Sequence, residues 1–168
     1  MITMGKRATL LRLCFLIPAA VFAAPNPGIS LGSWSFVGVP EPGMYAHAGF
    51  LLGVSDHFEL EALGVAEFMP IPAGMLLAGV SLGYSVLGPR TPTYFNMVAD
   101  FSFLQALVSS GVPGLGQSYL MLRLSPLVIG NPIYGHRDRL FSMGLLYDIQ
   151  ASSFSAVWNI LIIDWYPS

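Results

Sequence analysis

The stretch from His57 to Phe68, HFELEALGVAEF, decides how this chain folds. In an extended strand successive side chains point to opposite faces. One face would then be apolar: Phe58, Leu60, Ala62, Gly64, Ala66 and Phe68. The other face would consist of His57, Glu59, Glu61, Leu63, Val65 and Glu67, and it would hold all the charged side chains of the stretch. On a helix the three acids would point about 0°, 200° and 80° around the axis, leaving no apolar stripe. The stretch is predicted to be a strand.

The preceding segment, Met44 to Asp56 (MYAHAGFLLGVSD), alternates less sharply, and Ser55-Asp56 supplies a two-residue turn between the two runs. Two alternating runs joined by so short a turn are typical of a β-hairpin. We therefore expect a hairpin with one apolar face and one mixed face.

The composition indicates which solvent the apolar face meets. The chain has 168 residues, of which 54% are hydrophobic and only 10% are charged, and it contains 18 glycines and 13 prolines. A soluble domain has about 25% charged residues, so this chain lacks the polar surface that water requires. A membrane protein is predicted.

The N-terminus has the pattern of a cleavable secretory signal peptide. Lys6, Arg7 and Arg12 precede an apolar core at 13–22, and cleavage is expected after Ala23. Residues 1–23 would be the signal and residues 24–168 one barrel domain. An uncleaved anchor helix is the alternative, but the apolar run is shorter than the ~20 residues that a span requires.

Removal of the signal leaves four basic and nine acidic residues, a net charge of about −5, and no lysine. Nucleic-acid binding is therefore not expected, because it needs a basic surface. The single cysteine, Cys14, lies within the signal. The exported part can form no disulfide and offers no thiol ligand or nucleophile.

Two uncharged stretches, Phe68 to Pro89 and Phe101 to Leu122, are long enough for helical spans. The interior of the first contains Pro70, Pro72, Gly74, Gly79 and Gly83, and from Gly74 onward it alternates large apolar residues with small or polar ones. The second is interrupted by the turn signal SSGVPG at 109–114. A loop with unpaired backbone groups cannot lie in hydrocarbon, so closed β-structure is favoured over helices.

The same alternation continues along the exported chain between turn signals. It predicts strands at 29–38, 44–54, 57–68, 74–86, 94–105, 117–128, 138–150 and 154–166. Strands of this length can cross the bilayer when tilted, and eight strands form a small closed barrel. We predict an all-β, eight-stranded antiparallel up-and-down transmembrane β-barrel. Asp164 breaks the pattern, because strict alternation turns it outward, which is tolerable only near the water interface or after a β-bulge.

The signal peptide, the hairpin GFLLGVSDHFELEALG (49–64) and the eight-strand rhythm resemble the small eight-stranded bacterial outer-membrane barrels of the OmpX and OmpW type and their spirochaetal counterparts. The resemblance implies the cell outer membrane as the location, membrane lipid as the surroundings and the barrel-assembly machinery as a partner during insertion. It also implies a monomer without a cofactor.

Alternation places a polar set inside the predicted barrel. Its members are His47, Glu59, Glu61, Asn96, Asp100, Arg123, Asp148 and Asn159. In a lumen of low dielectric constant, Arg123 should pair with one of the acids. A bonded filling that stabilises the barrel is one interpretation, because eight strands leave an interior just wide enough for side chains. A narrow lumen passing small solutes, with a preference for cations, is the other.

Other patterns have simpler explanations than chemistry. His57, Glu59 and Glu61 share a strand face that could hold a divalent metal, although such alternation is usually lumen lining. His136 and Asp138 supply residue types of a hydrolase without a nucleophile motif, and 136–139 is interpreted as a solvated charged turn. The aromatic residues near strand ends are interpreted as girdle residues at the membrane interface: Trp34, Tyr94, Tyr134, Trp165 and Tyr166.

The leading functional hypothesis is a non-enzymatic outer-membrane barrel that is either a narrow passive channel or a structural or surface component. Three alternatives stay open: a helical inner-membrane protein, a secreted soluble β-barrel that binds an apolar ligand, and a lipid-modifying outer-membrane enzyme. The outward position of Phe101, Phe103, Leu122 and Leu124 argues against the soluble barrel.

Overall fold

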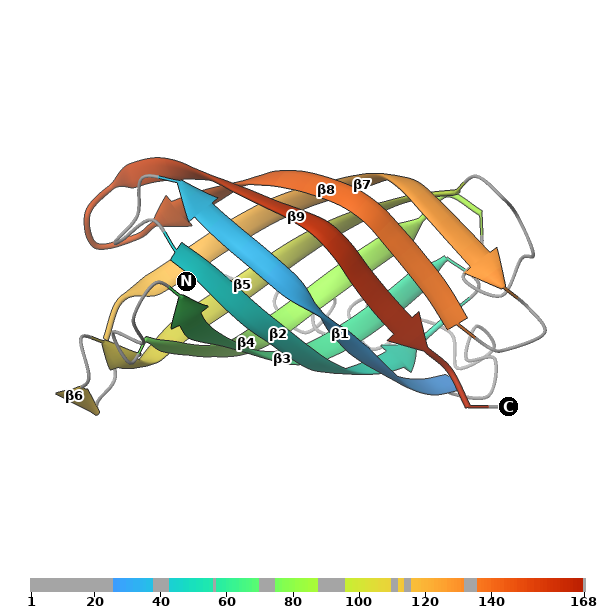
Figure 1. The fold of residues 1–168 in the computed structure, drawn as a ribbon, viewed down its shortest axis with the longest axis horizontal. Helices are drawn as coiled ribbons and strands as arrows, with labels where there is room; N and C mark the ends of the chain where they lie inside the picture. The colour runs from blue at the N-terminus through green and yellow to red at the C-terminus, as the bar shows by residue number, and fades with distance from the viewer. Residues whose placement is uncertain are drawn as a thin grey trace, which may run out of the picture.

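The computed structural model describes residues 26–37, 43–55, 57–69, 75–87, 96–109, 112–113, 116–131 and 136–167. The predicted signal peptide lies outside these residues. The described part forms nine strands (Figure 1): β1 (Asn26–Val37), β2 (Gly43–Gly53), β3 (Phe58–Met69), β4 (Leu76–Ser85), β5 (Asn96–Ser109), β6 (Val112–Pro113), β7 (Ser118–Asn131), β8 (His136–Asp148) and β9 (Ser153–Trp165).

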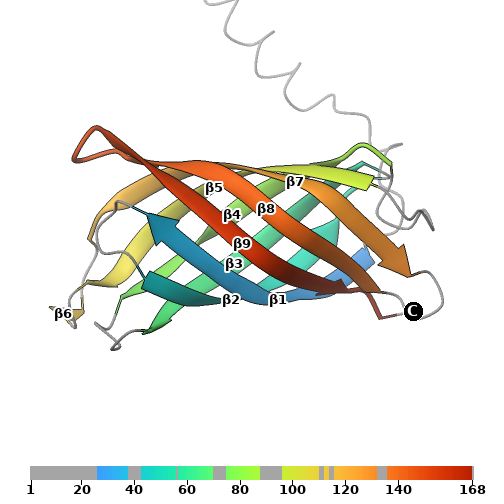
Figure 2. The ribbon, with the colours of Figure 1, turned by 45° about the horizontal axis from the view of Figure 1, so that its top comes forward.

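Eight of these strands close into a barrel. Each long strand pairs antiparallel with the next one along the chain, and β1 pairs with β9 to close the cylinder. Figure 2 shows the strands tilted around a common axis. This confirms the predicted all-β, eight-stranded antiparallel up-and-down barrel. The ninth strand, β6, lies within the predicted turn at 109–114 and pairs only with Val108 and Ser109 of β5.

The helical alternative is wrong for the described residues of both uncharged stretches, because these form β3, β4, β5 and β7. In the described part of the chain, no helix has the length and apolar character needed to cross a membrane.

The two ends of the barrel hold different strand connections. The terminal end is where β1 begins and β9 ends, together with the β2–β3, β4–β5 and β7–β8 connections. The opposite end holds the connections from β1 to β2, β3 to β4, β5 to β7 and β8 to β9. In Figure 1 the terminal end is on the right and β6 marks the opposite end.

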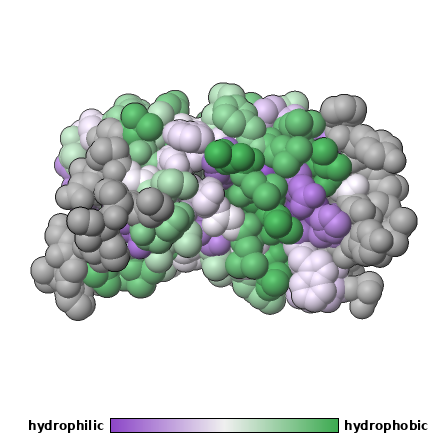
Figure 3. All heavy atoms as spheres, viewed as in Figure 1, coloured by the Kyte–Doolittle hydropathy of each residue, from purple (hydrophilic) through white to green (hydrophobic). Residues whose placement is uncertain are grey.

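Exposed and buried side chains alternate along the strands as the sequence predicts. In β3 the acids Glu59 and Glu61 are buried, whereas Phe58 and Leu60 are 45% and 46% exposed. Thirty large apolar side chains of the described strands and turns are exposed. Apolar residues cover much of the coloured part of the face in Figure 3. The outer wall is therefore apolar.

Strict alternation breaks along one row of the wall. In a regular strand one outward side chain lies between two inward ones. In β7, β8 and β9 there is one place where two successive side chains lie between them: Pro126 and Leu127 in β7, Leu140 and Phe141 in β8, and Ile160 and Leu161 in β9. The register shifts on both borders of the row, against β5 and against β1, whereas these three strands stay in register with one another. Phe141 has a φ of 56°. The row is a set of aligned β-bulges.

The bulge row reverses which side chains of β7, β8 and β9 face inward at the terminal end. Asp164 is fully buried, so the outward position given by strict alternation is wrong, and the alternative that a β-bulge precedes Asp164 is confirmed. Arg137 and Arg139 on β8 face inward as well, with exposures of 1% and 0%. Three charges thereby leave the apolar wall and enter the interior.

The interior near the opposite end is mainly apolar, with Glu67 and Asp148 as its buried acids. Its core includes Tyr45, Leu63, Leu77, Tyr119 and Met121, all exposed by 5% or less. The barrel interior thus divides into an apolar half and, at the terminal end, a charged half.

Candidate functional site: a buried ion cluster

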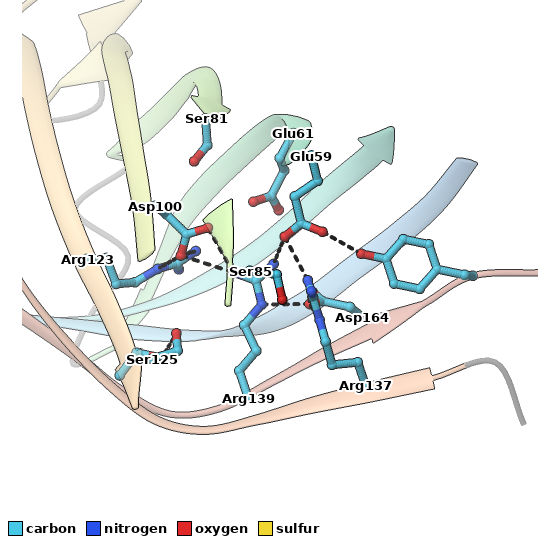
Figure 4. A network of polar contacts seen from close by, with 12 residues as sticks. Glu59, Glu61, Ser81, Ser85, Asp100, Arg123, Ser125, Arg137, Arg139 and Asp164 are labelled. Carbon is cyan, nitrogen blue, oxygen red and sulfur yellow. Dashed lines mark hydrogen bonds and ion pairs between the residues drawn. The ribbon is translucent and has the colours of Figure 1, made fainter. Parts of the chain in front are cut away.

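The charged half contains a group of ion pairs, drawn in Figure 4, that we call the ion cluster. It consists of three acids, three arginines and one tyrosine: Glu59, Asp100, Asp164, Arg123, Arg137, Arg139 and Tyr166. The six charged side chains are exposed by 2% or less. Three negative and three positive charges balance, as buried ions require.

Arg139 is the centre of the ion cluster, because it contacts all three acids. Its Nη1 donates to both carboxylate oxygens of Asp100 at 3.0 Å. Its Nη2 donates to Glu59 Oε1 at 2.9 Å, and its Nε donates to Asp164 Oδ2 at 2.6 Å. Charge-assisted bonds of this kind are among the strongest in proteins.

Glu59 joins opposite walls of the barrel. It lies on β3, and β8 is four strands away in either direction around the closed sheet. Glu59 Oε1 accepts from Arg137 Nη2 at 2.7 Å as well as from Arg139. Glu59 Oε2 accepts from the Tyr166 hydroxyl at 2.7 Å. One carboxylate therefore ties β3 to β8 and to the C-terminal residues across the lumen.

Tyr166 covers the ion cluster at the terminal end. It follows β9, and its ring lies 5.7 Å from the Arg137 guanidinium carbon and against Gly28, where a Cβ would approach the ring to 2.8 Å. Burial raises the pKa of the Tyr166 phenol well above its ordinary value. The hydroxyl therefore stays protonated and acts as a donor to Glu59.

Arg123 pairs with Asp100, one of the acids predicted for it. Arg123 Nε donates to Asp100 Oδ2 at 3.0 Å, and Nη2 lies 3.0 Å from the same oxygen. The guanidinium carbon also lies 5.1 Å from the centre of the Trp34 ring, within range of a cation–π contact. Trp34 thus lies where the charged half meets the apolar half.

A second buried pair lies beside Trp34. His47 Nε2 is 2.8 Å from Glu61 Oε1, and both side chains are buried. Glu61 occupies the space over Gly49, where any Cβ would collide with its carboxylate. The glycine therefore provides the room that this pair needs.

The remaining predicted lumen residues are buried but lie apart from the ion cluster. Asn96 donates to Ser85 Oγ at 2.8 Å and accepts from the Leu87 backbone N–H. Asp148 accepts from the backbone N–H of Ala151 in the β8–β9 turn. Asn159 accepts from the Ser142 backbone N–H. These three side chains satisfy local backbone or turn groups.

Several sequence interpretations are wrong. Residues 136–139 are not a solvated turn, since Arg137 and Arg139 lie in the ion cluster. Trp34 and Tyr166 are not girdle residues, because they are 1% and 7% exposed inside the barrel. Trp165 is 47% exposed on the outer wall. Tyr94 and Tyr134 lie outside the described residues.

The metal and hydrolase patterns, for which the sequence favours simpler structural explanations, are not assembled in the described residues. His57 is exposed and its Nδ1 donates to the Ser85 carbonyl at 2.9 Å, whereas Glu59 and Glu61 are buried. No group of three His, Cys, Asp or Glu residues suited to a metal occurs within these described segments. His136 Nε2 lies 3.6 Å from Asp138 Oδ2, and both side chains are partly exposed.

The arrangement leaves little room for water among these groups. The inward side chains at both levels of the lumen are almost inaccessible: Trp34, Tyr45, Leu104, Tyr119, Met121, Arg123, Arg137 and Arg139 are all at 2% exposure or below. A side chain that lines an aqueous channel would be accessible to water. Chemically, the site is a filling that links walls of the barrel.

No family model, curated protein or solved structure matches this chain.

Proposed function

We propose that this chain is an outer-membrane β-barrel with a filled lumen, which acts as a structural or surface component of the membrane and does not conduct solutes. The outer wall carries this proposal. Among the described residues, every Asp, Glu and Arg side chain is buried except Asp138, which is 33% exposed. Its neighbour His136 is the first residue of β8, so the exception lies at the terminal end.

An apolar wall of this extent fits lipid and not water. Soluble monomers rarely expose contiguous apolar patches larger than a few hundred Å², whereas this wall exposes thirty large apolar side chains. Inward-facing polar residues alternate with them along the strands. This is the inverse of a soluble barrel and the usual pattern of a membrane barrel.

Exposed aromatic side chains near both ends support the same proposal. Phe58, Tyr84 and Trp165 lie towards the terminal end, and the Phe58 and Tyr84 rings are 5.1 Å apart. Phe68 and Phe154 lie towards the opposite end. The ten residue-to-residue steps from Phe58 to Phe68 span about 33 Å along the strand, or about 25 Å along the axis at the usual tilt. This height equals that of the apolar band in membrane barrels.

The lumen favours a structural role over a channel. An acid excess would favour cation passage, but the ion cluster has as many arginines as acids. Apolar side chains fill the other half. A solute would have to displace both layers. In this proposal a monomer is exported by the signal at 1–23, is inserted by the barrel-assembly machinery, and needs no cofactor.

Two measurements on the refolded chain test the proposal. Closed membrane barrels often migrate differently on a gel before and after heating, and we expect such a shift for protein reconstituted into phospholipid vesicles. In planar bilayers we expect no channel events. A protein that stays in the aqueous phase without binding vesicles would contradict the membrane assignment. Regular conductance steps would contradict the filled lumen.

A further inference from the structure

The seam that closes the barrel, between β1 and β9, differs from the other interfaces. Its ladder runs from Ile29/Trp165 to Gly32/Ile162, breaks, and resumes at Ser35/Trp158. Two residues of β1 therefore face three of β9 in the middle of the wall. Within the described strands, each of the other register shifts lies close to the end of at least one of the two paired strands, at Met44, Leu76 and Asn96. The β1–β2 ladder is uninterrupted over its eleven pairs.

Unsatisfied polar groups gather on the two strands of this seam. Among the described residues, eight buried side-chain nitrogen or oxygen atoms have no hydrogen-bond partner. Five of them belong to β1 or β9: Ser30 Oγ, Trp34 Nε1, Ser155 Oγ, Asn159 Nδ2 and Asp164 Oδ1. A buried polar group without a partner destabilises the folded state relative to one that is bonded. The seam is the least well satisfied part of the interior.

The ion pairs of the cluster hold β9 but not β1. Asp164 ties β9 to two arginines of β8. The inward positions of β1 at the same level are Gly28, Ser30 and Gly32, which contribute no charged group. Between the terminal end and Trp34, β1 is therefore attached by backbone pairing and by the packing of Tyr166 on Gly28.

We propose that the barrel opens locally at the β1–β9 seam, between the terminal end and Trp34. In the open state β1 stays paired with β2 and moves away from β9, while the ion cluster remains assembled. Opening makes a lateral route from the surrounding lipid to the level of Trp34 and Asn159. The N–H groups of Trp34 Nε1 and Asn159 Nδ2, which have no partner in the closed barrel, can then bond to acceptors outside the wall. The unpaired backbone groups of the parted strands keep this state a minor one.

Hydrogen exchange on the full chain, refolded in detergent and followed by mass spectrometry, tests this inference. Local opening sets the exchange rate of protected amides. We expect those amides at 28–33 of β1 that face β9 to exchange at least about tenfold faster than the amides at 60–66 of β3, which has regular neighbours on both sides. Equal rates, or slower exchange in β1, would overturn the inference.

Two engineered disulfides that share one residue identify which side of β1 opens. In a Cys14→Ser chain, Leu31→Cys with Ile163→Cys locks the seam, since these two residues are directly opposite. Leu31→Cys with Ala48→Cys locks the β1–β2 interface instead. The first disulfide should slow β1 exchange to the rate of β3, and the second should leave it fast. If both slow it equally, or neither does, seam opening is refuted. Exchange in detergent reads the opening and not membrane partition, so it is independent of the proposed function.

Discussion

Replacing Glu59 with Gln removes the charge that joins the two walls of the barrel and changes the side-chain volume little. Three donors lose a carboxylate acceptor: Arg137 at 2.7 Å, Arg139 at 2.9 Å and Tyr166 at 2.7 Å. Two acids then remain for three buried arginines. The variant should therefore fold into a barrel with an uncompensated positive charge in its interior.

The size of the effect follows from burial. Glu59 and the two arginines that bind it are at most 2% exposed, so water cannot replace the lost acceptor. Breaking a buried ion pair by removing one partner costs about 3–5 kcal/mol. We expect Glu59→Gln to lower the free energy of unfolding by about this amount. Adding Arg137→Met should restore at least about 1 kcal/mol, because two acids then balance two arginines.

Urea unfolding in phospholipid vesicles, followed by the gel mobility of the folded barrel, measures these changes. Glu67→Gln is the matched control, since Glu67 lies on the same strand and face but forms no ion pair with any described residue. It should cost less than about 1 kcal/mol. The reasoning is refuted if Glu59→Gln costs no more than Glu67→Gln, or if Arg137→Met adds its own loss to that of Glu59→Gln.

Three further predictions use the same unfolding measurement. Gly79→Ala should lower the free energy of unfolding by about 1–3 kcal/mol, because its Cβ would collide with the Phe103 carbonyl. Gly64→Ala should be nearly neutral, because its Cβ would lie 3.9 Å from the nearest atom. Equal losses would contradict the close approach of β4 and β5 at Gly79. Leu122→Arg, on the exposed middle of the wall, should cost about 2–4 kcal/mol in vesicles, and Ile149→Arg, in the β8–β9 turn, about 0–1 kcal/mol; a loss independent of position would argue against a lipid-facing wall. Tyr166→Phe keeps the ring but removes the donor to Glu59, so it should cost about 1.5–3 kcal/mol; no loss would mean that this bond does not stabilise the barrel.

The eight strands could be predicted because the outer face and the inner face of the wall differ in polarity. Outward positions are mostly apolar and inward positions accept polar side chains, so the hairpin of β2 and β3 alternates along most of its length. The same rule placed Glu59, Asp100 and Arg123 inside, and these side chains are buried. The sequence therefore predicted the inward position of three members of the ion cluster.

The inward position of the other three charged members could not be predicted from alternation, because it depends on the bulge row. Alternation counted from the opposite end puts Arg137, Arg139 and Asp164 on the outer wall. If this wall faces lipid, as we propose, each charge there would cost about 2–4 kcal/mol at the middle of the bilayer and less near the interface. One bulge in each strand turns all three inward, where their opposite charges pair. The signal available in the sequence was the presence of charges of both signs at forbidden positions of neighbouring strands.

The aromatic residues were misplaced for a different reason. Aromatic rings suit both the membrane interface and the interior of a small barrel, so position near a strand end does not decide between them. Trp34 fills the lumen over Arg123. Tyr166 lies one residue beyond Trp165, and alternation alone sends these two rings to opposite sides.

The central claim is that the outer wall touches lipid while the inner residues are sealed from it. Quenching of tryptophan fluorescence by lipids brominated along their acyl chains tests this most directly, with single-tryptophan variants that keep Trp34, Trp158 or Trp165. The exposed Trp158 and Trp165 should be quenched, Trp158 most strongly by bromines deep in the bilayer, and the enclosed Trp34 should not. Quenching of Trp34 as strong as that of Trp158, or quenching of Trp158 by aqueous iodide alone, would contradict the account.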